Sequence, residues 1–132
     1  MAAEWVVETN ITKASLESDG ILYVRYTDSS SQETLEEAKL ILAEMKKHTA
    51  GKTYPAIIDL STIRSVAADA RAYHAGPETA EVISAAALII KNPISKVIGN
   101  FFLSLNKPIY PVQLFISEED AKVWLKSYIN HV

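Results

Sequence analysis

The sequence predicts an α/β domain built on one mixed β-sheet, and three observations support this prediction. First, an Asp19-Gly20 pair separates two runs of apolar and β-branched residues, a strong hairpin signal because both residues tolerate positive φ. Second, the rest of the chain alternates apolar runs with amphipathic segments, an order that favours parallel strands and right-handed crossovers. Third, 132 residues with 48% hydrophobic and 22% charged residues suit one globular core.

The N-terminal part predicts three antiparallel strands, over residues 5–9, 12–18 and 21–27. In the third of these, apolar side chains occupy both alternating sets of positions, so we expect this strand to lie inside the sheet. A helix over residues 34–51 follows. Thr34 and Glu37 have the spacing of a capping box, and the apolar residues of this segment share one helical face.

The middle of the chain predicts a buried strand over residues 54–60 and a short helix over residues 65–73. Pro77 after Gly76 begins another one or two helical turns. The small apolar run of residues 84–90 is interpreted as a central strand, although its alanines leave a helix as the alternative.

The strongest amphipathic signal is the helix that begins with Asn92 as N-cap and Pro93 at the first helical position. Its main apolar stripe, which we expect to face the core, consists of Ile94, Val97, Ile98, Phe101, Phe102 and Leu105. A second ridge beside this stripe consists of Ser95, Gly99, Leu103 and Asn106. This ridge either packs against a neighbouring element of the same chain or allows a homodimer contact or a lipid-like pocket.

Residues 110–116 alternate as a strand, and Ser117 caps a last helix with three acidic residues in its first turn. The predicted order of elements is therefore β-β-β-α-β-α-β-α-β-α.

Two stretches carry a resemblance to a known family. Residues 57–63, Ile-Ile-Asp-Leu-Ser-Thr-Ile, resemble the strand of STAS domains that ends in an apolar-Asp-Leu-Ser turn. Residues 94–128 are similar to the bacterial SpoIIAA-like proteins, which are related to STAS and CRAL-TRIO domains. The resemblance implies one STAS-like domain over residues 1–132, a scaffold that binds partners more often than it catalyses.

The phosphorylatable STAS proteins carry a switch serine at a helix N-terminus, within an Asp-Ser-Ser-Gly segment. Counted from Asp59, the matching positions here are Ala67, Ala68, Asp69 and Ala70, so the phosphoacceptor serine is missing. Ser65 lies two residues away. An N-capping role is the interpretation we favour for Ser65 or Asp69, with a regulatory role as the alternative.

Composition excludes several classes of function. A net charge of −3 without a cluster of basic and aromatic residues argues against nucleic-acid binding. The longest apolar run is far shorter than the roughly 20 residues of a membrane-spanning helix. The sequence contains no cysteine and shows no secretory signal, so we expect a cytoplasmic protein. Nothing in the sequence indicates a cofactor or a metal site.

These observations lead to two functional hypotheses. The first is a non-enzymatic regulatory module that binds a protein partner, with residues 59–73 as the docking surface. The second is a carrier or sensor of a small apolar or lipid-like molecule. A hydrolase using Asp59 and His74 is a third hypothesis, disfavoured because the sequence has no nucleophile motif. The residues that we expect at a binding site are Asp59, Ser61, Ser65, Asp69, Tyr73, His74, Phe102 and Leu103.

Overall fold

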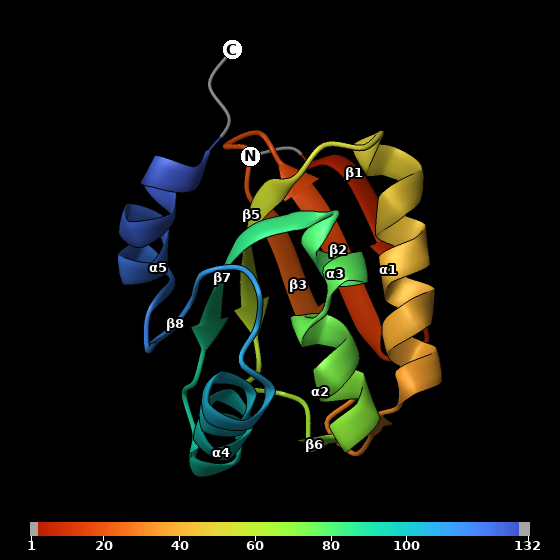
Figure 1. Ribbon diagram of the computed structural model, residues 1–132, viewed down its shortest axis with the longest axis vertical. Coiled ribbons are helices and arrows are strands. Elements are labelled where there is room, and N and C mark those ends of the chain that lie inside the picture. Colours follow the sequence, from red (N-terminus) through yellow and green to blue (C-terminus); the bar gives the residue numbers. More distant parts are fainter. Residues whose placement is uncertain (1–2, 130–132) are drawn as a thin grey trace.

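The computed structural model describes residues 3–129, which form one main six-stranded sheet flanked by helices (Figure 1). The order of strands across the sheet is β1-β2-β3-β5-β7-β8. Neighbouring strands pair antiparallel from β1 to β3 and parallel from β3 to β8. The strands are β1 (Ala3–Glu8), β2 (Thr12–Glu17), β3 (Leu22–Tyr26), β5 (Tyr54–Asp59), β7 (Ile83–Ile89) and β8 (Val112–Phe115).

The predicted mixed sheet is confirmed, and both β3 and β7 are interior strands as expected. The hairpin between β2 and β3 turns at Gly20, which has a φ of 82°. Asp19 supports this turn because its carboxylate accepts a hydrogen bond from the backbone N–H of Ile21 at 3.1 Å. The alternative of a helix over residues 84–90 is wrong, since these residues pair with strands on both sides.

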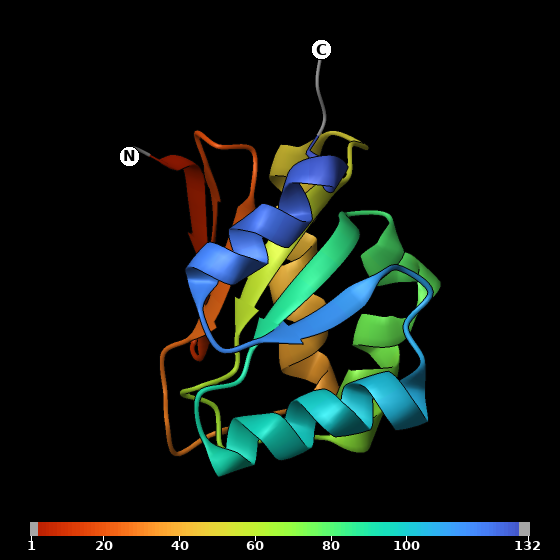
Figure 2. The same ribbon diagram turned by 90° about the vertical axis from the view of Figure 1, so that its left-hand side faces the viewer.

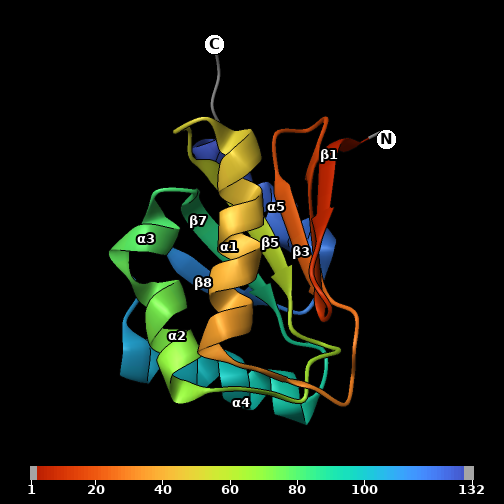
Figure 3. The ribbon, with the colours of Figure 1, turned by 90° about the vertical axis from the view of Figure 1, so that its right-hand side faces the viewer.

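Helices cover both faces of the sheet and one of its ends. Figure 3 shows α1 (Leu35–Thr49), α2 (Ala68–Ala75) and α3 (Pro77–Ala80) on one face. Figure 2 shows α5 (Glu118–Leu125) on the other face and α4 (Pro93–Phe101) lying across the lower end of the sheet. A π-helical segment (Phe102–Asn106) continues α4, and a 3-10 turn (Lys126–Tyr128) follows α5.

The core is divided by the sheet into two clusters of buried apolar side chains. The larger cluster lies on the α1 side and includes Leu22 and Ile41. The smaller lies on the α5 side, where Ile57 and Ala87 of the sheet pack with Leu125. Within residues 3–129, no helix combines the length and the apolar character needed to cross a membrane.

The segment expected to be a helix from residue 65 begins instead as a short strand. β6 (Ser65–Val66) pairs in parallel with β4 (Gln32–Glu33), and the helix begins only at Ala68. The backbone N–H of Ala67 donates to the carbonyl of Glu33 at 2.9 Å, which extends this pairing. The partner strand lies more than 30 positions earlier in the chain, so local sequence rules could not reveal it.

The orientation expected for α4 is wrong. Ser95 and Gly99 are buried, whereas Ile94 and Leu105 of the main apolar stripe are 52% and 66% exposed. Only Phe102 of that stripe is fully buried. Because α4 crosses the end of the sheet, it presents a narrow face to the core, and small residues on that face allow a close approach.

Gly99 shows how close this approach is. A Cβ atom at this position would lie 3.0 Å from Cδ2 of Leu114 and 3.1 Å from Cγ2 of Ile90. The small-residue ridge therefore packs against the sheet of its own chain, which is one of the interpretations that the sequence left open. Its small residues are thus not free to form a homodimer contact.

Candidate functional site

A buried carboxylate forms the centre of the most polar cluster inside the fold. Glu33 is 0% exposed and is the last residue of β4, directly before Thr34, the N-cap of α1. Its Oε1 accepts a hydrogen bond from the hydroxyl of Tyr26 at 2.9 Å and lies 2.8 Å from Nε2 of His74. Residues of β3, β4 and α2 thus meet at one oxygen atom.

The position of His74 is fixed by bonds at the end of α2. The hydroxyl of Tyr110 donates to the carbonyl of His74 at 2.6 Å, and Oγ1 of Thr79 donates to the carbonyl of Tyr73 at 3.0 Å. These bonds satisfy carbonyl groups that a helix end leaves without partners. They also hold the imidazole ring against Glu33.

The environment changes the protonation behaviour of this cluster. Burial of the His74 imidazole opposes its protonation, but the Glu33 carboxylate outweighs this effect and raises the pKa of His74 above its ordinary value. Burial, together with the charge of Glu33, raises the pKa of Tyr26 well above its ordinary value. The raised pKa of His74 favours the protonated imidazole beside the Glu33 side chain, and the raised pKa of Tyr26 keeps its phenol neutral.

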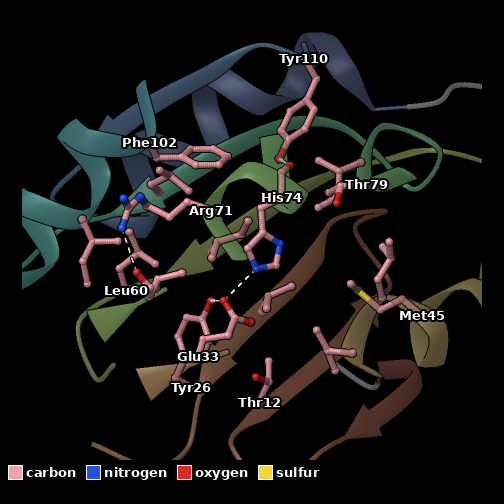
Figure 4. A pocket seen from close by; sticks show the side chains of 18 residues that line it. Thr12, Tyr26, Glu33, Met45, Leu60, Arg71, His74, Thr79, Phe102 and Tyr110 are labelled. Atoms are coloured by element: carbon pink, nitrogen blue, oxygen red, sulfur yellow. Dashed lines mark hydrogen bonds and ion pairs between the residues drawn. The ribbon is translucent and has the colours of Figure 1, made fainter. Parts of the chain in front are cut away.

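The cluster borders a cavity of about 60 Å³ between the sheet, α1, α2 and the π-helical segment (Figure 4). Figure 4 shows His74 and Tyr26 directed at the same carboxylate, with Thr12 below them and Phe102 on the opposite side. Most of the lining is apolar. It consists of Thr12, Val24, Tyr26, Glu33, Ile41, Leu42, Met45, Ile58, Leu60, Val66, Arg71, His74, Thr79, Ile83, Leu88, Ile98, Phe102 and Tyr110.

Asp59 and Ser61 form a turn at the carboxyl end of β5. Oδ1 of Asp59 accepts bonds from the backbone N–H of Ser61 at 2.9 Å and from its hydroxyl at 2.6 Å. The carbonyl of Ser61 accepts a bond from Nδ2 of Asn92 at 2.7 Å, which ties this turn to the start of α4. The structural interpretation of Asp59 thus fits these contacts. The carboxylate beside His74 is Glu33, not Asp59.

Ser65 and Asp69 do not cap α2. The N-cap position is Ala67, which makes no side-chain capping bond. Ser65 lies in β6, and Asp69 is exposed in the first turn of α2, where its charge suits the helix dipole. The capping role expected for either residue is therefore wrong, because Ser65 lies in the strand before the helix and Asp69 lies inside the first turn, after the N-cap.

The remaining predicted residues lie in different environments. Tyr73 is half-buried and donates to Oε2 of Glu78 at 2.9 Å, and burial, with this bond, raises the pKa of Tyr73 to about 12. Phe102 lines the cavity with His74, as Tyr110 does. Leu103 is half-buried in the π-helical segment and is not part of the cavity lining.

A second concave region, an open groove of about 370 Å³, lies between β6 and α4. Its lining consists of Arg64, Ser65, Val66, Arg71, Pro93, Ile94, Val97, Ile98 and Phe101. Arg71 is held in place by a bond from Nη1 to the carbonyl of Val66 at 2.9 Å and from Nε to Oδ1 of Asn106 at 3.3 Å. Its guanidinium also lies 5.7 Å from the centre of the Phe101 ring.

The sequence analysis predicted His74 and Phe102 as site residues and included Arg71 in the expected docking surface, residues 59–73, but it missed Glu33 and Tyr26. Glu33 follows a polar loop and precedes a helix, a position where an exposed glutamate is ordinary. It becomes buried because β4 pairs with β6 and turns its side chain inward. No motif or spacing rule joins Glu33 to a histidine 41 positions later.

Comparison with solved structures supports the SpoIIAA-like fold. An uncharacterised protein from Shewanella loihica PV-4, of the DUF3478 family and with a SpoIIAA-like fold, has a TM-score of 0.59 and 16% identity. The match covers 95% of this chain and 98% of that one. A protein of unknown function from Arthrobacter sp. FB24 has 25% identity and a TM-score of 0.32, with 85% of this chain and 96% of that one covered.

Sequence comparison gives a family but no characterised relative. A search of curated proteins found no match. The profile of a family described as a domain of unknown function, DUF7793, matches residues 14–129, which is most of the chain. The chain therefore has a SpoIIAA-like fold and belongs to the DUF7793 family.

Proposed function

We propose that this chain is a non-enzymatic, cytoplasmic module that binds a protein partner through α4 and the adjoining groove. The observation that carries this proposal is a row of large apolar side chains on the outer side of α4 and of the π-helical segment that continues it, which we call the α4 surface. It consists of Ile94, Val97, Phe101 and Leu105, which are all exposed. The lack of cysteine fits the reducing cytoplasm.

The α4 surface has the spacing of a binding stripe. Its residues follow one another at intervals of three and four positions, so they lie on one side of the helix. Each is about half exposed, and covering it completely would contribute about 1 kcal/mol of hydrophobic free energy. Scattered apolar residues are common on protein surfaces, but a contiguous row is typical of an interface.

The charges around α4 indicate the chemistry of the partner. Residues 82–117 contain three lysines and no aspartate or glutamate, although the whole chain has a net charge of −3. Arg64 and Arg71 line the groove beside the α4 surface. A partner segment with apolar anchor residues and carboxylates would complement both features.

The groove favours a protein partner over a lipid membrane. Ile94, Val97 and Phe101 line a concave space that an inserted side chain can fill, as anchor residues do at protein interfaces. A membrane surface is broad and offers no such projection. The docking surface expected from the sequence, residues 59–73, contributes Arg64, Ser65, Val66 and Arg71 to this groove.

The alternative function, a carrier of a lipid-like molecule, has less support. The internal cavity measures about 60 Å³. That is less than half of the roughly 150 Å³ of an engineered cavity that accommodates benzene. An acyl chain would require a large rearrangement of the core.

The test begins with site-specific photocrosslinking in the native cells, with the photoreactive residue at position 97 or, as a control, at position 123. Val123 is also exposed but lies on α5. The partner captured by the crosslink is then identified and purified. Its affinity for the wild-type chain is compared with its affinity for the Val97→Asp and Val123→Asp variants. We expect Val97→Asp to weaken binding at least tenfold and Val123→Asp to leave it within twofold.

A partner that binds both variants as tightly as the wild type would contradict the proposal. So would a chain that self-associates through this surface in light scattering, or that binds anionic vesicles in a manner abolished by Val97→Asp. Arg64→Glu provides a test of the charge argument. It should weaken binding and reduce the dependence of the affinity on salt concentration.

A further inference from the structure

Glu33, which lines the internal cavity, carries a carboxylate oxygen that no described protein group satisfies. Oε1 of Glu33 has two partners, Tyr26 and His74, but Oε2 is buried and has no hydrogen-bond donor within the described residues. Buried carboxylate oxygens normally accept hydrogen bonds, because leaving one without a donor costs about 1–3 kcal/mol or more. This oxygen therefore indicates a site for a group that donates a hydrogen bond.

A second polar atom strengthens this inference. Thr12 is 0% exposed and lines the same cavity, and its Oγ1 also lacks a partner among residues 3–129. A hydroxyl of this kind can donate or accept. The cavity thus contains two unsatisfied oxygens from separate elements, β2 and β4, within a lining that is otherwise largely apolar.

The charges at the cavity select an uncharged occupant. Glu33 contributes one negative charge, and it is paired with His74 at 2.8 Å. Arg71 adds a second basic group to the lining. An ammonium ion would place a further positive charge among these groups, and a carboxylate would face the ionised Glu33. A neutral hydroxyl can donate to Oε2 without adding a positive charge beside His74 and Arg71 and without placing a second carboxylate beside Glu33.

The shape of the cavity limits the size of the occupant. Its volume of about 60 Å³ exceeds the 10–15 Å³ or so that one water molecule requires, but it is too small for an aromatic ring with substituents. Met45, Ile41 and Phe102 provide an apolar lining for a short carbon chain. The His74 side chain is 25% exposed and the Glu33 side chain 1%, so a ligand reaches the carboxylate past the imidazole.

We propose that this cavity is a binding site for a small uncharged alcohol, whose hydroxyl donates to Oε2 of Glu33 and whose short apolar chain lies against Met45 and Phe102. This site is separate from the α4 surface, so either proposal can fail while the other holds.

Three probes of nearly equal size test the proposal. Ethanol can donate a hydrogen bond, acetonitrile can only accept one, and ethylamine is a cation at neutral pH. Each is titrated into isotopically labelled protein, and chemical shifts of Thr12, Tyr26 and Met45 are followed by NMR. We expect saturable shifts with ethanol, and dissociation constants at least fivefold higher for acetonitrile and ethylamine.

The Glu33→Gln variant tests whether the side chain at position 33 determines the preference for a hydrogen-bond donor. The amide oxygen of the new side chain can keep accepting from Tyr26 and His74, which directs its NH2 group toward the cavity. The preference should then reverse, so that acetonitrile binds more tightly than ethanol. A dispersed spectrum confirms that this variant folds, and Asp59→Asn, outside the cavity lining, should keep the wild-type preference.

Several results would overturn the proposal. The first is equal affinity for ethanol and acetonitrile in the wild type, which would show that Oε2 does not select a donor. The second is tightest binding of ethylamine, which would show a cation site. The third is the absence of saturable shifts with all three probes, which would show that the cavity holds only water.

Discussion

The contact between His74 and Glu33 predicts an unusual dependence of stability on pH. The pKa of His74 is raised in the folded protein, so the folded state binds a proton more tightly than the unfolded state. The stabilisation is complete below the unfolded pKa of about 6.5 and is lost as the pH rises through the folded pKa. Stability should therefore fall with rising pH in this interval, by at most about 1.4 kcal/mol per pH unit for one proton.

The structure also gives the size of the effect of removing the imidazole. In His74→Ala, the Glu33 carboxylate, with a side chain 1% exposed, would keep Tyr26 as its one donor among the described residues. Removing one partner of a buried ion pair costs about 3–5 kcal/mol. His74→Gln keeps a donor near Oε1 without the charge, so we expect a smaller loss of about 1–2 kcal/mol.

Urea unfolding of the wild type and of His74→Gln between pH 6 and pH 9, at constant ionic strength, tests this reasoning. The difference in unfolding free energy between the two proteins isolates the contribution of His74 from those of other titrating groups. We expect this difference to be largest at pH 6 and to shrink as the pH rises. A difference that stays constant, or that grows with pH, would refute the assignment of a protonated imidazole beside Glu33.

Three further substitutions test the packing that positions the site, each by urea unfolding at pH 7. Thr12→Val removes a buried hydroxyl without a protein partner and should raise the unfolding free energy by about 1 kcal/mol; a loss would show that this hydroxyl is satisfied. Gly99→Ala should lower the unfolding free energy by about 1–2 kcal/mol, because overpacking against Leu114 exceeds the gain in helix propensity. A higher unfolding free energy would show that the Leu114 side chain moves aside at little cost. Asn92→Ala should lower the unfolding free energy by about 1–2 kcal/mol, because it removes both the α4 N-cap and the bond to Ser61. Asn92→Asp keeps an N-capping side chain and should lower the unfolding free energy less. Equal losses in the two variants would show that the cap contributes little.

The fold was predictable because its signals are local. The Asp19-Gly20 turn determines the hairpin between β2 and β3, and the capping positions Thr34, Asn92 and Ser117 each mark the start of a helix in the structure. Each of these devices depends on residues within a few positions of one another. The order of strands and helices then restricts the topology to a mixed sheet with right-handed crossovers.

The candidate site was only partly predictable, because it depends on contacts between distant segments. Glu33 becomes buried through the pairing of β4 with β6, and its partner His74 follows 41 positions later. The sequence also did not reveal which face of α4 is buried. A strongly apolar stripe normally faces the core, but here Ser95 and Gly99 do so, because α4 crosses the end of the sheet. Periodicity identifies the faces of a helix, and only tertiary packing decides which face is buried.

Val66, Arg71 and Ile98 line both the internal cavity and the groove beside α4. The cavity and the groove therefore share these three side chains as part of their lining. Thermodynamic linkage requires any coupling between the cavity and the groove to be equal in both directions. If an alcohol in the cavity changes the affinity of the groove for a partner by some factor, that partner changes the affinity for the alcohol by the same factor. Measuring either one determines the other.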